Sequence, residues 1–177
     1  MPASNKEITR YHYIVLFLWL ALTLLMAMYF ITNRLALFDP NNKLLGKEGS
    51  DIIQSVREIT ALKNLGLSNT IIHFTNDSCS CTKYSEDHKA AIDEKAKLDG
   101  FTVINIDLPS ELLTIIPSTP SILIMDDAED LLYFGPYSAG LACSKSNGYV
   151  EVVLKNYSKG YNSNLILSDV KGCYCGI

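Results

Sequence analysis

The apolar residues of the chain form one continuous segment, followed by a longer region of periodic character. The segment YIVLFLWLALTLLMAMYFI begins at Tyr13, and no charged residue interrupts the chain between Arg10 and Arg34. A helix of this length rises about 28 Å, close to the thickness of a bilayer core. A soluble core helix would have a polar face, and a signal peptide would have a shorter apolar stretch. The pattern predicts an uncleaved transmembrane helix over residues 13–32, after a short N-terminal tail over residues 1–12.

The region after this segment predicts a folded domain behind a linker. Residues 33–49 are mostly polar, contain proline and asparagine, and are expected to be the linker. Apolar positions at helical spacing predict helices, and β-branched runs predict strands. The expected elements are a helix from Asp51 to about Leu65, a strand Thr70–Thr75, a helix Thr82–Leu98, a strand Phe101–Asp107 with both faces buried, a short helix Glu111–Ile116, a hairpin of strands Ser121–Met125 and Leu131–Phe134, and a helix Tyr149–Tyr157.

This order of elements predicts an α/β domain over residues 50–158. A strand–helix–strand unit followed by an antiparallel hairpin makes a mixed sheet with helices on both faces. Residues 159–177 are expected to be a C-terminal tail. The chain carries 15 basic and 19 acidic residues, and no basic run exceeds two residues, so nucleic acid is not an expected partner.

Cysteine chemistry is the main candidate for function, because four of the five cysteines form two C-x-C pairs. The first pair, Cys79 and Cys81, lies at the expected start of a helix, where unpaired N–H groups and the helix dipole favour a thiolate. A disulfide within this pair needs a turn-like backbone. His88 lies two helical turns beyond Cys81 and is a proton carrier, a metal ligand near the thiols, or a partly exposed helix residue. His73, in a strand, is expected to be a core residue with its polar atoms satisfied.

The second pair, Cys173 and Cys175, lies in the tail and leaves three alternatives open. It is a second redox pair that exchanges disulfides with Cys79 and Cys81, or part of a four-thiolate site for zinc or copper. In the third alternative it forms structural disulfides that fix the tail, with Cys143 as one candidate partner.

Two further features of this sequence resemble the thioredoxin superfamily. A strand ends at Phe74 and a cysteine follows five residues later at a helix start, which resembles the placement of the nucleophilic cysteine in that family. Thr119 and Pro120, followed by a strand, resemble the family's cis-proline loop. The resemblance implies that Pro120 is cis, lies close to Cys79, and shapes with Thr119 the groove that holds a partner chain. Thr82 stands where thioredoxins keep the resolving cysteine, which departs from the family pattern.

More narrowly, the whole chain resembles an uncharacterised group of bacterial membrane-anchored thioredoxin-like proteins. The shared features are C-x-C in place of C-x-x-C, the histidine at position 88, the GPYS segment at residues 135–138 and the Gly-Cys-x-Cys tail at residues 172–175. The resemblance and the cysteines together suggest a single-pass inner-membrane protein whose domain faces the periplasm.

The expected function is thiol–disulfide exchange with protein thiols or disulfides, without a cofactor. Cys79 would be the nucleophile, and Cys81 would resolve the mixed disulfide. The alternative is a non-enzymatic metal-binding or metal-delivery protein that holds zinc or copper with Cys79, Cys81, Cys173 and Cys175.

Overall fold

The computed structural model describes residues 10–59, 62–108, 115–140 and 148–176. It divides into two compact units, residues 1–34 and residues 35–177. The first unit contains one long helix, α1 (Arg10–Arg34), which is long and apolar enough to cross a membrane. Its large apolar side chains are exposed, as in a helix that packs against lipid rather than against protein.

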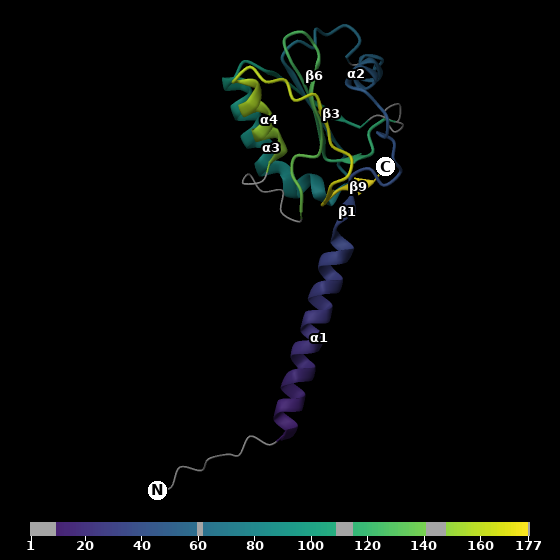
Figure 1. The fold of residues 1–177 in the computed structure, drawn as a ribbon, viewed down its shortest axis with the longest axis vertical. Coiled ribbons are helices and arrows are strands. Elements are labelled where there is room, and N and C mark those ends of the chain that lie inside the picture. Colours follow the sequence, from purple (N-terminus) through teal and green to yellow (C-terminus); the bar gives the residue numbers. More distant parts are fainter. Residues whose placement is uncertain (1–9, 60–61, 109–114, 141–147, 177) are drawn as a thin grey trace. The chain divides into compact units, whose positions relative to one another are not determined.

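The second unit is built on a mixed sheet, as the sequence predicted, but the sheet has five strands rather than the four expected (Figure 1). The order of its strands is β3-β2-β5-β6-β7. Strands β2 and β3 run parallel, whereas β5 runs antiparallel to both β2 and β6. The strands are β2 (Thr70–Thr75), β3 (Thr102–Asp107), β5 (Ser121–Met125), β6 (Leu131–Gly135) and β7 (Leu165–Ile166).

Helices cover both faces of this sheet because successive side chains of a strand point to opposite sides. In β5, Leu123 packs into the core with α2 (Gly49–Arg57), whereas Ile122 and Ile124 pack into the core with α3 (Ser80–Leu98) and α4 (Tyr149–Tyr157). Figure 1 shows α3 and α4 together on one side of the sheet and α2 on the other. The expected fold class, a mixed α/β sheet with helices on both faces, is confirmed.

The expected linker over residues 33–49 is wrong, because most of this stretch belongs to the folded unit. Strand β1 (Ala36–Leu37) pairs with β8 (Lys171–Gly172) near the C-terminus. Phe38 and Leu44 are buried in the core beside α2. The carboxylate of Asp39 accepts hydrogen bonds from the backbone of Lys43 and Leu44, which closes a turn between the two apolar residues. The domain boundary therefore lies near residue 35 rather than residue 50.

Two smaller expectations also differ from the structure. Strand β3 forms the edge of the sheet and is partly exposed, so the expectation that both of its faces are buried is wrong. Helix α2 begins at Gly49, where the Asp51 carboxylate accepts a hydrogen bond from the backbone of Glu48. Most of the short helix expected at Glu111–Ile116 lies outside the described residues.

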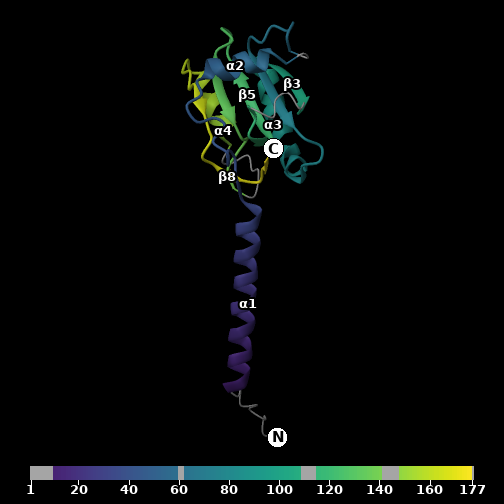
Figure 2. The same cartoon turned by 90° about the vertical axis from the view of Figure 1, so that its right-hand side faces the viewer.

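The expected C-terminal tail is also part of the fold. After β7 the chain returns as β8 and then as β9 (Cys175–Gly176), which pairs antiparallel with β4 (Ser118–Thr119). The segment after residue 160 is drawn in yellow in Figures 1 and 2. Tyr174 lies between β8 and β9, and its buried ring packs edge-on against Phe38. The last residues of the chain thus stabilise the first residues of the domain.

Candidate functional site

The first C-x-C pair lies at the start of α3, as the sequence predicted. After β2, the side chain of Asn76 accepts a hydrogen bond from the Ser78 backbone, and the Asn76 carbonyl accepts one from the Cys79 backbone. This turn places Cys79 at the N-cap of α3, with extended backbone angles, and Cys81 within the first turn. Both sulfurs therefore lie near the positive end of the helix dipole, which favours the thiolate over the thiol.

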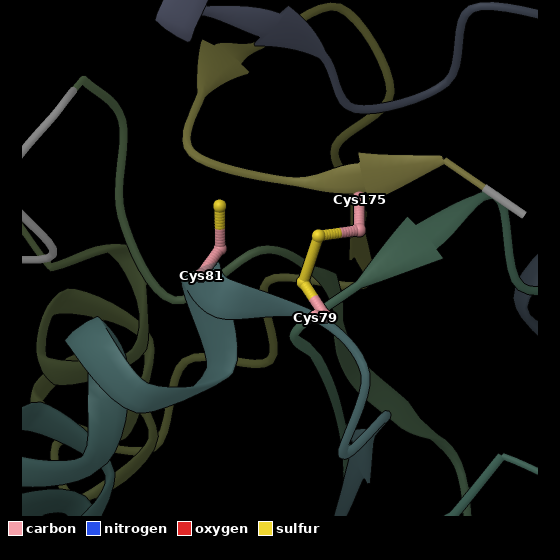
Figure 3. Close-up of side chains that lie close together, drawn as sticks. All are labelled: Cys79, Cys81 and Cys175. Atoms are coloured by element: carbon pink, nitrogen blue, oxygen red, sulfur yellow. A yellow bond between two sulfur atoms is a disulfide. The ribbon is translucent and has the colours of Figure 1, made fainter.

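Two disulfides join this pair to the C-terminal pair. Cys79 is bonded to Cys175 and Cys81 is bonded to Cys173, with Cα–Cα distances of 5.9 and 5.5 Å. Figure 3 shows the first of these disulfides and the Cys81 side chain pointing toward the C-terminal segment. The two C-x-C motifs are thus bonded to each other, the outer two cysteines in one disulfide and the inner two in the other. Neither motif closes a disulfide within itself.

This connectivity changes the roles that the sequence suggested. Cys81 was the expected resolving cysteine for Cys79, but the sulfur bonded to Cys79 belongs to Cys175. Cys173 and Cys175 were expected as a second pair, but each is bonded to the first motif. Cys143, the other candidate partner of the tail, lies outside the described residues.

The loop before β5 lies directly against Cys79. The Thr119–Pro120 peptide bond is cis, as the resemblance implied. The sulfur of Cys79 lies 3.6 Å from the carbonyl oxygen of Thr119. In the disulfide this sulfur carries no proton, but a free Cys79 thiol could donate a weak hydrogen bond to that oxygen. The predicted proximity of Pro120 and Cys79 is therefore confirmed.

The same loop also binds the backbone of the C-terminal segment. Thr119 pairs with Cys175, and Ser118 pairs with Gly176, in the two-residue ladder of β4 and β9. Ser118 and Thr119 are fully buried in this arrangement. Cys175 is consequently held twice, by a covalent bond to Cys79 and by backbone pairing with Thr119.

The four cysteine residues differ in exposure. Cys79 and Cys81 are buried, with exposed fractions of 3% and 6%, whereas Cys173 and Cys175 are half-buried. A thiolate from solvent would therefore approach either disulfide from the side of its C-terminal cysteine. Its attack there would release a thiolate at the start of α3, where the helix dipole stabilises the leaving group.

Three of these sulfurs also form a cluster that suits a soft metal ion. The sulfurs of Cys79, Cys81 and Cys175 all lie within 4.8 Å of one another. In a tetrahedral zinc site with bonds of about 2.3 Å, neighbouring sulfurs are separated by nearly 4 Å. Cys173, bonded to Cys81, is the natural fourth donor once the disulfides are reduced. Each bonded pair of sulfurs must separate on reduction, and the four thiolates would then suit Zn²⁺ or Cu⁺ by donor type.

His88, on α3, is buried rather than partly exposed, and it does not belong to this sulfur cluster. Its Nε2 lies 2.6 Å from the carboxylate of Glu151 in α4. Along α3, His88 lies about 10 Å beyond Cys81. Its role as a proton carrier stays a prediction, because the described contacts of its imidazole are with Glu151 and with the ring of Tyr137.

His73 was expected to be a satisfied core residue, and it is fully buried on the central strand β2. Its Nδ1 lies 2.7 Å from the hydroxyl of Tyr137, and its Nε2 lies 2.8 Å from Asp93 in α3. Burial lowers the pKa of His73, although the neighbouring Asp93 carboxylate partly opposes this effect. Burial alone would raise the pKa of Asp93, but hydrogen bonds from His73 and Lys89 outweigh it and lower that pKa.

The pairing of Ser118 and Thr119 with the C-terminus is the functional feature that the sequence did not reveal. One signal could have indicated it. Both cysteine motifs have the same one-residue spacing, which allows two neighbouring strand or helix-start segments to form two adjacent bridges. The sequence also did not reveal the role of Tyr137. This residue lies in the GPYS segment, and its contact with His73 joins elements far apart in the sequence.

The fold and the site together define a mixed α/β domain with two adjacent disulfides, preceded by a helix apolar enough to cross a membrane. The chain belongs to the family DUF6436, a domain of unknown function, which matches residues 52–177. No curated protein and no solved structure matches this chain.

Proposed function

We propose that this protein is a membrane-anchored thiol–disulfide oxidoreductase of the thioredoxin superfamily, with Cys79 and Cys175 as its exchanging pair. One observation carries the proposal: a cysteine at the N-cap of α3 is bonded to a cysteine near the chain end, against a cis-proline loop. The helix start stabilises the Cys79 thiolate, and β9 is a short, partly exposed segment.

The exchange balances with a dithiol donor and a partner disulfide. The donor first reduces Cys79–Cys175, supplying two electrons and two protons and leaving as a disulfide. The Cys79 thiolate then attacks one sulfur of the partner disulfide, and the other partner sulfur leaves as a thiolate. Cys175 next attacks Cys79, which releases the second partner sulfur and restores the Cys79–Cys175 bond. The same steps run in reverse oxidise a partner dithiol.

The proposed location is the bacterial inner membrane, with the domain in the periplasm. An apolar helix at the N-terminus and two disulfides in the domain support this location, because disulfides persist in oxidising compartments. The expected partners are the membrane and protein thiols or disulfides.

Trapping of mixed disulfides tests the exchanging pair. In the full-length protein, Cys175→Ser leaves Cys79 without its resolving cysteine, so we expect disulfide-linked adducts between Cys79 and partners. Cys79→Ser is the matched control, and it should form no disulfide-linked adduct at Cys81. Adducts that form through Cys81 in both variants, with none at Cys79, would contradict the assignment.

The cluster of three sulfurs favours one second candidate, a non-enzymatic metal-binding or metal-delivery function. In that function the reduced Cys79, Cys81, Cys173 and Cys175 would bind one Zn²⁺ or Cu⁺. The test is addition of each ion to the fully reduced full-length protein, followed by removal of free metal. One ion per chain that is lost in every single Cys→Ser variant supports this candidate, and binding of none removes it.

A further inference from the structure

The two disulfides hold different parts of the C-terminal segment. Cys173 lies between two fixed residues: Gly172 pairs with Ala36, and the buried Tyr174 donates a hydrogen bond from its hydroxyl to the Ser138 carbonyl. The Cys173 backbone itself donates to the Gly140 carbonyl. The Cys81–Cys173 bond is therefore embedded in structure that persists when the bond is cleaved.

Cys175 lies beyond these fixed residues. Among the described residues, its contacts are the bond to Cys79 and the short ladder that joins β9 to β4. Gly176 takes part in the same ladder and is exposed. Cleavage of the Cys79–Cys175 bond leaves Cys175 and Gly176 held, among the described residues, by this two-residue ladder, while Tyr174 stays anchored.

Loop closure does not distinguish the two bonds. Each closes a loop of comparable length, with sequence separations of 96 and 92 residues. Once Cys81–Cys173 is closed, the bond between Cys79 and Cys175 adds only a small ring. Loop-closure entropy grows with loop length, so the second bond restricts the unfolded chain much less than the first. The Cys79–Cys175 bond can open without releasing the whole C-terminal segment.

Departure of β9 would uncover a site of defined shape. Ser118 and Thr119 are buried in the ladder, and their backbone groups lose their partners when β9 leaves. Unpaired backbone groups are costly away from water, and an extended peptide can pair with them by strand addition. The residue opposite Thr119 is the one whose sulfur meets Cys79.

We propose that Cys175–Gly176 is a detachable occupant of the partner site, which closes that site until Cys79–Cys175 is reduced. With Cys81–Cys173 still closed, β9 leaves β4, and β4 receives an extended segment of a partner protein. That segment pairs antiparallel with Ser118–Thr119 and places its own cysteine opposite Thr119, against Cys79. The partner class is thus an extended cysteine-containing polypeptide rather than a small-molecule thiol, and this inference rests on the proposed exchange at Cys79.

The test uses the chain's own C-terminus as a probe. The protein is full-length Cys175→Ser, in which Cys79 is free and Cys81–Cys173 is retained. The first probe is a peptide of residues 172–177 with serine in place of Cys173, whose remaining cysteine is bonded to a thionitrobenzoate group. The Cys79 thiolate attacks the cysteine sulfur of the peptide, and the thionitrobenzoate leaves as a coloured thiolate. A matched probe carries N-methyl groups on that cysteine and on the next residue, so that neither of these two residues can donate a backbone hydrogen bond.

The expected result is that the unmodified peptide reacts with Cys79 about tenfold faster than the N-methylated peptide. This ratio corresponds to about 1.4 kcal/mol. A second variant, Cys175→Pro, should react with the unmodified peptide faster than Cys175→Ser does, because proline fits poorly in a paired strand and displaces the protein's own β9. This variant keeps the test informative if the chain end of Cys175→Ser still covers β4.

A third probe, the small disulfide dithiobis(nitrobenzoate), has no peptide backbone and reports the reactivity of Cys79 alone. The three probes together distinguish three outcomes. If both peptides and the small disulfide react at Cys79 with rates unaffected by N-methylation, in Cys175→Ser and in Cys175→Pro, the detachable occupant is overturned while exchange at Cys79 stands. If Cys79 reacts with none of the three probes in either variant, the proposed function fails as well. If the unmodified peptide reacts with Cys79 faster than the N-methylated peptide does, the inference is supported.

Discussion

Thr119 and Cys175 lie opposite each other in an antiparallel ladder, and the sulfur of Cys175 is bonded to Cys79, whose own sulfur lies 3.6 Å from the Thr119 carbonyl oxygen. Three segments far apart in the sequence therefore meet at one disulfide. The start of α3 supplies Cys79, and the cis-proline loop supplies the short strand β4. The C-terminal segment supplies Cys175, which is bonded to Cys79 and pairs with Thr119 in β4. The predictions below follow from this arrangement and from the core that supports it.

The first prediction concerns the stability that the two disulfides provide. We expect the double variants Cys79→Ser/Cys175→Ser and Cys81→Ser/Cys173→Ser each to lower the free energy of unfolding by only about 2 kcal/mol from loop closure, because the remaining bond still closes a long loop. Removal of all four cysteines should cost about 6 to 7 kcal/mol. Urea unfolding of the three variants and the wild type measures these values. A full loss of stability in either double variant would show that the two bonds do not restrict the same loop.

The second prediction concerns the segment that the sequence suggested was a linker. Phe38→Ala should lower the free energy of unfolding by about 3 to 5 kcal/mol, because this ring is fully buried against Tyr174 and the core. Leu45 is 79% exposed, and Leu45→Ala in the same segment should change that free energy by less than about 0.5 kcal/mol. Equal and small effects of the two substitutions would return residues 35–49 to the role of a linker.

The third prediction concerns pH. Burial lowers the pKa of His73 in the folded protein, whereas an unfolded histidine titrates near about 6.5. The unfolded state therefore binds a proton that the folded state lacks, and the free energy of unfolding decreases as the pH falls below about 6.5. The contribution of this residue is fully present above that value and changes by at most about 1.4 kcal/mol per pH unit.

Denaturant unfolding between pH 8 and pH 5 tests this dependence. His73→Gln should reduce the slope of stability against pH in this range, because glutamine does not titrate. The pKa of Asp93 is also lowered, but its contribution is lost only below about pH 4, outside the range measured. An unchanged slope in His73→Gln would contradict the assignment.

The fourth prediction concerns the side of the membrane on which the domain lies. A reporter enzyme that is active only in the periplasm, fused after residue 177, should be active, and the same reporter fused before Met1 should be inactive. A cytoplasmic C-terminus would reject the proposed location. It would also favour the metal site over the disulfides, because thiols stay reduced in that compartment.

The sequence predicted those elements whose signals are local. Strand β2, helix α3 and the hairpin of β5 and β6 lie within one or two residues of their expected positions, because β-branched runs and helical spacing depend on neighbouring residues. The placement of Cys79 at a helix start follows from the same local pattern. The cis state of Pro120 came from the family resemblance rather than from periodicity.

The sequence did not predict features that depend on distant pairing. Phe38 and Leu44 flank a polar stretch over residues 39–43, and their burial depends on β1 meeting β8 more than one hundred residues later. The edge position of β3 depends on the order of the strands, which no window of sequence contains. Disulfide connectivity is likewise not determined by spacing. The sequence therefore could not show that Cys79 is bonded to Cys175 and Cys81 to Cys173 rather than in another pairing.

The central claim is that Cys79–Cys175 is the exchanging disulfide and Cys81–Cys173 the retained one. It is tested most directly by equilibrating the full-length protein with dithiol and disulfide buffers of graded potential, blocking free thiols, and mapping the remaining disulfides by mass spectrometry. The account predicts a species with Cys79 and Cys175 free and Cys81–Cys173 intact, populated at less reducing potentials than the fully reduced protein. If Cys81–Cys173 opens first, or if the two bonds always open together, the account is contradicted.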